Sequence, residues 1–201
     1  MHANALLIGG YDEPLKGIII REALMRIASE TPYAKVLLVR DHYEPMPEME
    51  DVNLSLDMEY LTGGCFCCSL KHDFESLLAA KGGEEGVRSF IVEVPLTADM
   101  DAVEGSMRAV LGPLAQATKT FVMGSSTYHV MAENFPVLFK QNMGVSDLLV
   151  LREEEGPVDS LEGGLGPEWQ KAKNLGDVDP GLSNAGRIYL ISRTGTTPWP
   201  F

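Results

Sequence analysis

The stretch from Ala5 to Ile27 reads ALLIGGYDEPLKGIIIREALMRI, and it decides the fold class. It begins with a short apolar run, Ala5–Gly9, which is typical of a buried strand, and it continues into Leu15–Ile27, which we expect to be a helix. Similar apolar runs recur along the chain with helical patterns between them. Continuous apolar strands that alternate with helices predict a parallel sheet covered on both faces.

The same pattern predicts the remaining elements. Further strands are expected at Lys35–Arg40, Met58–Leu61, Arg88–Val94, Thr118–Met123, Asp147–Leu151 and Arg187–Ser192. Further helices are expected at Leu70–Ala80, Asp101–Leu111, Val130–Gln141 apart from Pro136, and Trp169–Leu175. Asp41–Asp57 and Glu153–Gly186 are acidic, contain Pro or Gly, and predict long loops. We therefore expect a three-layer α/β fold like that of P-loop NTPases, with a mostly parallel sheet of about 6–7 strands and helices on both faces, as a single domain over residues 1–201.

Composition limits the partners. The chain carries 29 acidic and 16 basic residues, for a net charge of -13. A surface this negative repels nucleic acid and anionic membranes, so we expect neither as a partner. No run approaches the roughly 20 apolar residues of a membrane span, and the first residues do not have the pattern of a signal peptide. The expected location is the cytoplasm.

All three cysteines lie within four positions, at Cys65, Cys67 and Cys68. A disulfide framework would have an even number of cysteines spread along the chain, so this cluster indicates metal binding or redox chemistry instead. The alternative is that the three are small buried residues in a crowded turn, since free cysteine packs well in protein cores.

The residues around the cysteines favour a metal site. Gly63 and Gly64 allow a tight turn just before the thiols, and a turn into a following helix would gather the sulfurs around one ion. Thiolates prefer soft or borderline cations such as Zn²⁺, Cu⁺ or Co²⁺. Three sulfurs leave one tetrahedral position, for which His72, water, a carboxylate or a partner protein are the candidates.

The segment Gly64-Cys65-Phe66-Cys67-Cys68-Ser69-Leu70 resembles the Gly-Cys-x-Cys-Cys segment of the CobW-like GTPases, relatives of the nickel-insertion GTPases of urease and hydrogenase. Asp73-Phe74 and Leu77 continue the resemblance, and the order of expected elements is similar from the first strand to about Pro198. The resemblance implies a GTPase domain in which the thiol segment binds metal and GTP hydrolysis gates its transfer. It also implies that the family's C-terminal domain is absent, since it would lie beyond Phe201.

The resemblance further implies a phosphate loop of the form Gly-x4-Gly-Lys-Ser/Thr after the first strand. The chain has Gly9-Gly10-Tyr11-Asp12-Glu13-Pro14-Leu15-Lys16-Gly17 there, so the two glycines and Lys16 are the expected nucleotide remnants. Pro14 lacks an N–H donor. Asp12 and Glu13 place negative charge where a triphosphate would lie, and the helix dipole offers only about half a charge of opposite sign. The other interpretation of Lys16 is a solvated residue at a helix start.

Two further nucleotide motifs are altered. After Arg88–Val94 the family has Glu-x-x-Gly; Glu93 is present, but Leu96 replaces the glycine. The guanine motif Asn-Lys-x-Asp is replaced by Leu151-Arg152-Glu153-Glu154, which leaves Arg152 as a candidate nucleotide contact. Departures on three loops favour lost or altered binding of GTP and Mg²⁺, so we do not expect ordinary GTP hydrolysis.

Asp41 follows the second expected strand, where the family has a switch segment that begins with Glu. It is a candidate for that residue's metal-linked role, and a solvated acidic loop is the other interpretation. The sequence thus predicts a metallochaperone-like accessory protein that delivers a cation of the Zn, Co or Ni class to a client metalloprotein or a corrinoid-pathway protein. The alternatives are a pseudo-GTPase scaffold with structural cysteines and an active NTPase with an altered phosphate loop. Formation of a homodimer is left open.

Overall fold

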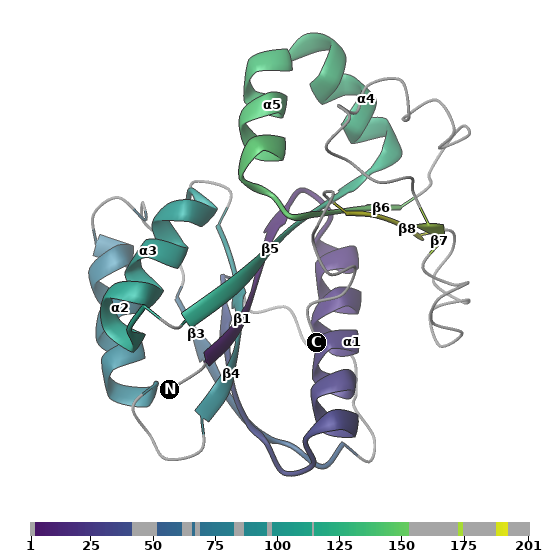
Figure 1. Cartoon of the computed structure of the whole chain (residues 1–201). Coiled ribbons are helices and arrows are strands. Elements are labelled where there is room, and N and C mark those ends of the chain that lie inside the picture. The colour runs from purple at the N-terminus through teal and green to yellow at the C-terminus, as the bar shows by residue number, and fades with distance from the viewer. Residues whose placement is uncertain are drawn as a thin grey trace. The chain divides into compact units, whose positions relative to one another are not determined.

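The computed structural model describes residues 3–41, 52–61, 66, 69–82, 87–95, 98–113, 115–152, 173–174 and 188–192. These residues form two compact units. The first is built from the stretches up to Gly9 and from Lys16 to Thr118, and the second from Gly10 to Leu15 and from Lys119 onward. Each unit has parallel strands flanked by helices (Figure 1), so the predicted α/β class is confirmed.

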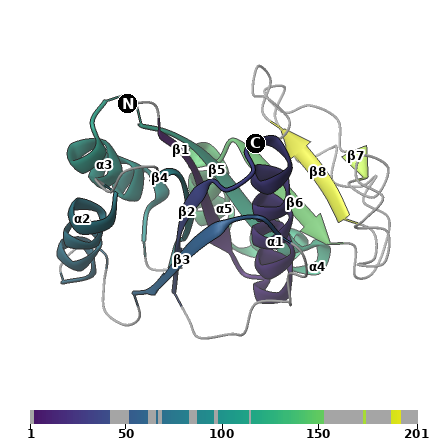
Figure 2. The same cartoon turned by 90° about the horizontal axis from the view of Figure 1, so that it is seen from below.

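The first unit contains four parallel strands in the order β3-β2-β4-β1. The elements that lie wholly or mainly in it are β1 (Ala3–Gly10), α1 (Glu13–Glu30), β2 (Lys35–Arg40), β3 (Ser55–Tyr60), α2 (Ser69–Lys81), β4 (Val87–Glu93) and α3 (Met100–Leu111). Helices α2 and α3 cover one face of these strands and α1 covers the other (Figures 1 and 2). The apolar residues of β1, β2 and β4 are therefore buried between two layers of helix, which explains why these strands read as continuous apolar runs.

The second unit contains most of β5 (Ala115–Gly124) and all of β6 (Leu148–Arg152), which pair in parallel. β8 (Ile188–Ser192) pairs antiparallel with β6, and β7 (Lys173–Asn174) pairs antiparallel with β8. The helices α4 (Ser125–Asn134) and α5 (Pro136–Val145) connect β5 to β6. Among the described strands, β1 to β6 all have parallel neighbours within their units, so the prediction of a mostly parallel sheet is confirmed.

Two predicted helices differ from the structure. The expectation of a short helix at Trp169–Leu175 is wrong at Lys173–Asn174, which form β7. Val130–Gln141 belongs to two helices, whose break falls on Phe135. Pro136 does not interrupt the helical segment but begins α5, because the first helical position needs no N–H donor.

The predicted loop Asp41–Asp57 ends earlier than expected, since β3 begins at Ser55. Within the part of the chain that the structure describes, no helix combines the length and the hydrophobicity that a membrane crossing requires.

Candidate functional site

Three parallel strands of the first unit end beside a small hollow. Arg40 is the last residue of β2, Glu93 is the last residue of β4, and Leu61 directly follows β3. All three line the hollow, whose volume of about 10 Å³ is enough for roughly one water molecule. Parallel α/β folds bind their ligands at this edge of the sheet, so the hollow marks the place where site residues are expected to gather.

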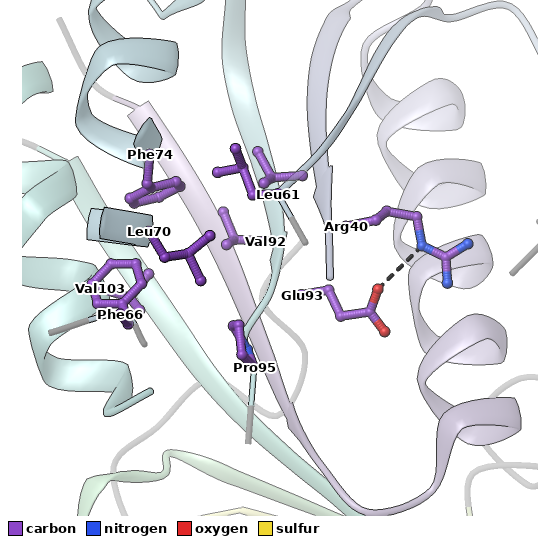
Figure 3. A pocket seen from close by; sticks show the side chains of 10 residues that line it. Arg40, Leu61, Phe66, Leu70, Phe74, Val92, Glu93, Pro95 and Val103 are labelled. Atoms are coloured by element: carbon purple, nitrogen blue, oxygen red, sulfur yellow. Dashed lines mark hydrogen bonds and ion pairs between the residues drawn. The ribbon is translucent and has the colours of Figure 1, made fainter. Parts of the chain in front are cut away.

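The hollow has a charged side and an apolar side. Figure 3 shows Arg40 and Glu93 facing each other on one side, with Phe66, Leu70 and Phe74 on the other. The apolar residues come from α2 and from the chain that precedes it. Their side chains are buried, so the hollow is closed by hydrocarbon on the side where the thiol segment enters α2.

Glu93 lies between two buried cations. Lys16 Nζ, from the first turn of α1, lies 3.4 Å from Glu93 Oε1, and Arg40 Nε donates a hydrogen bond of 3.1 Å to Oε2. The backbone N–H of Asp41 also donates to Oε2, at 3.3 Å. The three charged side chains are at most 3% exposed. A buried charge is tolerated only when it is paired, so each of these side chains depends on the others. Through these contacts the cluster joins the ends of β2 and β4 to α1.

The structure therefore corrects one interpretation of Lys16. The interpretation of Lys16 as a solvated residue at a helix start is wrong, because Lys16 is 1% exposed and its ammonium group is paired with Glu93. The sequence singled out Lys16 and Glu93 on separate loops, and the structure brings them together. Arg40 was missed. Its only signal in the sequence is that a charged residue closes the apolar run KVLLVR.

In the second unit, the N-terminus of α1 receives a carboxylate from the chain itself. Asp12 directly precedes the helix, and its Oδ1 accepts the backbone N–H of Leu15 at 3.0 Å, which is the geometry of an N-cap. Arg152, the last residue of β6, donates from Nε to Asp12 Oδ2 at 2.8 Å, and its Nη2 donates to both carboxylate oxygens. A helix N-terminus attracts anions. Here an internal carboxylate, itself paired with an arginine, occupies that position.

The backbone before Asp12 lies against β5. Gly10 has a φ of +128°, and a Cβ at this position would lie 1.9 Å from the carbonyl oxygen of Val122. The same carbonyl accepts the N–H of Tyr11 at 2.9 Å. The close approach to β5 thus explains why residue 10 is glycine without reference to a nucleotide, whereas Gly9 is an ordinary residue within β1.

Three positions of this loop offer no free backbone N–H group to a phosphate. The N–H of Tyr11 is bonded to β5 and the N–H of Leu15 is bonded to Asp12. Pro14 has no N–H group. A phosphate loop depends on consecutive N–H groups that point at the ligand. The described loop therefore differs from a phosphate loop in its hydrogen bonds as well as in its sequence.

The expected metal ligands lie largely outside the described residues. Cys65, Cys67 and Cys68 all fall there, whereas Phe66 between them is described and buried. His72 is exposed on α2. Among the described residues, no group of at least three His, Cys, Asp or Glu side chains could hold a metal ion.

The altered nucleotide positions Leu96, Glu153 and Glu154 also lie outside the described residues. Comparisons of the chain with protein-family models, with curated proteins and with solved structures find no match. The resemblance to the CobW-like GTPases therefore stays a prediction that rests on the thiol segment and on the order of the elements.

Proposed function

We propose that the chain is a metal-handling accessory protein, in which Cys65, Cys67 and Cys68 bind a soft or borderline divalent cation. The observation that carries the proposal is where these cysteines enter the fold. The segment that contains them follows β3, which ends at Tyr60, and leads into α2 at Ser69. It thus begins at the carboxyl edge of a parallel sheet, which is the edge where α/β proteins place their ligand sites.

The donor set suits a cation that must later be released. Zinc and its borderline relatives take four ligands, and thiolates are among their preferred donors. Three cysteines leave one position for water or for a ligand of the receiving protein. We propose that the receiver is a client metalloprotein or a protein of a corrinoid pathway, and that transfer takes place in the cytoplasm, where reducing conditions keep thiols free.

We also propose that the loop before α1 does not bind a nucleotide triphosphate in the ordinary way. The hydrogen bonds of Tyr11 and Leu15 and the Asp12–Arg152 pair support this part of the proposal. An incoming phosphate would have to displace the Asp12 carboxylate from the helix N-terminus and separate it from Arg152. Calorimetry with GTP or ATP and Mg²⁺ tests this, and we expect no heat of binding at millimolar nucleotide.

Metal analysis tests the central part of the proposal. The full chain is purified under anaerobic conditions, loaded with Zn²⁺, freed of excess metal and measured for bound zinc. We expect about one ion per chain and a loss of most of it in Cys67→Ser. Ser69→Ala, which alters an exposed neighbour at the start of α2, is the matched control and should retain the metal. Full metal content in Cys67→Ser would contradict the proposal.

The Asp12–Arg152 pair equally favours a second candidate function, a pseudo-GTPase scaffold that has lost its nucleotide site and whose cysteines are structural. The two candidates differ in what the thiols do. A scaffold would bind no zinc in the measurement above, and the Cys67→Ser change would alter its stability alone.

A further inference from the structure

The outermost strand of the first unit has an open edge. β3 stands at the end of the strand order β3-β2-β4-β1, beside β2 (Figure 2), and no other described strand pairs with it. It is a regular strand, since its six residues, Ser55–Tyr60, stay in parallel register with Lys35–Arg40. Such an edge is a template on which the backbone of another chain can add a strand.

The hydrogen bonds around β3 show which of its backbone groups face outward. The N–H of Ser55 donates to the carbonyl oxygen of Ala34, and the N–H of Leu61 donates to that of Arg40. Successive residues of a strand direct their N–H and C=O groups to opposite edges, so every second residue from Ser55 to Leu61 bonds to β2. Leu56 and Met58 therefore direct these groups to the open edge, where the described residues provide no hydrogen-bond partner for them.

The side chains of β3 give this edge its chemical character. On one face, Asp57 and Glu59 share the ammonium group of Lys81, at 2.7 and 2.8 Å. Their side chains remain 41% and 36% exposed, and two carboxylates share one cation, so negative charge is in excess. On the other face, Leu56 and Met58 are partly buried apolar residues. A strand added here would meet carboxylates on one face and hydrocarbon on the other.

We infer that β3 is a docking edge for an extended segment of a partner protein in which basic and apolar residues alternate. Hydrogen bonds to the backbone of Leu56 and Met58 provide affinity, and a Lys or Arg side chain opposite Asp57 or Glu59 forms a favourable cross-strand pair. The net charge of -13 also attracts a basic partner from a distance. The inference goes beyond the proposed function, because nothing in it depends on the cysteines.

A second copy of the chain fits this edge poorly. When two copies of β3 pair antiparallel across a two-fold axis, the registers that pair the middle of the strand place Asp57 opposite either Asp57 or Glu59 of the other copy. Like charges directly opposite each other are destabilising. The charges of β3 therefore disfavour acidic strands, including its own, and favour basic ones.

The test is the fluorescence anisotropy of a labelled peptide that alternates lysine with valine, titrated with the full, reduced chain. The control peptide has the same residues arranged as a block of lysines followed by a block of valines. It carries the same charge but cannot keep its lysines on one face of a strand, so it should bind about 3–30-fold more weakly. Equal affinities for the two peptides would overturn the inference.

Met58→Pro tests the backbone of the edge. Proline removes the N–H group that points outward and leaves the bonds to β2 in place, which is why edge strands tolerate it. Met58→Ala is the matched control, because it loses the same side chain and keeps the N–H group. Met58→Pro should bind the alternating peptide about 2–10-fold more weakly than Met58→Ala, the usual effect of one hydrogen bond. If the two variants bind equally well, β3 is not the docking edge.

The double variant Asp57→Asn, Glu59→Gln tests the charges. It loses two cross-strand pairs and should bind the alternating peptide about 2–30-fold more weakly. A matched double variant removes two exposed carboxylates elsewhere, through Asp101→Asn on α3 and Glu133→Gln on α4, and should change the affinity by less than about twofold.

Equal weakening in the two double variants would assign the binding to net charge and overturn the inference. Should Met58→Pro fail to fold, this comparison decides by itself. A wild-type chain that sediments as a dimer and binds no peptide would also overturn the inference, since a second copy would then occupy the edge.

Discussion

The Gly9–Lys16 loop and the Leu61–Leu70 segment both follow a parallel strand and lead into a helix, yet the described residues that are buried in them differ in kind. Charged groups hold the loop: Asp12 caps α1 and pairs with Arg152, and Lys16 pairs with Glu93. In the segment, the described residues that are buried are apolar. The charges of the loop are thus used by the fold itself. The loop therefore has a structural role, whereas the segment is the place where we propose ligand binding.

The largest effect is expected from Glu93→Ala, which disrupts the buried charged cluster that includes Lys16 of the loop. The change leaves Lys16 and Arg40 buried without the carboxylate that they share, and removing one partner of a buried ion pair costs about 3–5 kcal/mol. Urea unfolding measures the loss. Glu30→Ala, which breaks the exposed Arg26–Glu30 pair on α1, is the control and should cost at most about 0.5 kcal/mol. Equal losses in the two variants would show that the cluster does not stabilise the fold.

Gly10→Ala should give the next largest effect. The new Cβ would overlap the carbonyl oxygen of Val122, and a φ of +128° is strained for any residue with a side chain. We expect a loss of at least about 2 kcal/mol in unfolding free energy. Gly17→Ala is the contrast, because nothing lies within 4 Å of its Cβ position in α1, and it should stabilise the protein by about 1 kcal/mol. If Gly10→Ala were as stable as wild type, the close approach to β5 would not explain why residue 10 is glycine. The nucleotide role that the resemblance implies for Gly10 would then be the remaining explanation.

Arg152→Ala sharpens the comparison at the N-terminus of α1. It removes the hydrogen bonds to Asp12, whose oxygen can still cap the helix, and should cost about 1–2 kcal/mol. Asp12→Ala removes the cap as well, which should add about 0.5–2 kcal/mol to the loss. Because both changes break the same Asp12–Arg152 interaction, the double variant should lose less unfolding free energy than the sum of the two single losses. Strict additivity in thermal unfolding would show that the pair is not coupled.

The smallest effect is expected from the ion pairs that join α2 to β3, the two elements on either side of the thiol segment. Lys81 Nζ of α2 lies 2.7 Å from Asp57 Oδ2 and 2.8 Å from Glu59 Oε1 of β3. The hydrogen bonds that the Lys81 ammonium group donates to Asp57 and Glu59 raise the pKa of Lys81 above its ordinary value. These two ion pairs should therefore stabilise the fold fully from neutral pH up to about pH 10.4, the ordinary lysine pKa, and lose this effect as the pH rises through the higher folded-state pKa.

Lys81→Met tests this last expectation. Its melting temperature should be slightly below that of wild type at neutral pH, and the difference should shrink at strongly alkaline pH. High salt should also reduce it, because the side chain is partly exposed and its charge is screened. A difference that is constant with pH and salt would assign the effect to packing of the lysine stem instead.

The fold was largely predictable because it depends on local patterns. The run KVLLVR predicted β2 with its observed ends, Lys35 and Arg40. The start of α1 was placed too late at Leu15, although Asp12 followed by Pro14 is a recognised signal for a helix start. Lys173 and Asn174 were misassigned because a two-residue strand is formed by pairing with β8, which no local pattern reports.

The candidate site was predictable only in part. Lys16, Glu93 and Arg152 were each identified from their places after strands or in a loop, but the pairs that they form were not. Arg152 meets Asp12 across 140 positions of the chain, and Arg40 meets Glu93 across 53. Such pairs depend on tertiary packing, and the sequence shows only that a charge is present. The sequence alone therefore led us to expect that Asp12 would repel phosphate. The structure shows that Arg152 neutralises the charge of the Asp12 carboxylate.

The most direct test of the central claim is X-ray absorption at the zinc edge of the anaerobically loaded full chain. If the cysteine segment is the ligand site, the nearest shell will be dominated by sulfur at about 2.3 Å, the usual zinc–thiolate distance. A nearest shell made only of nitrogen and oxygen at about 2.0–2.1 Å would contradict it.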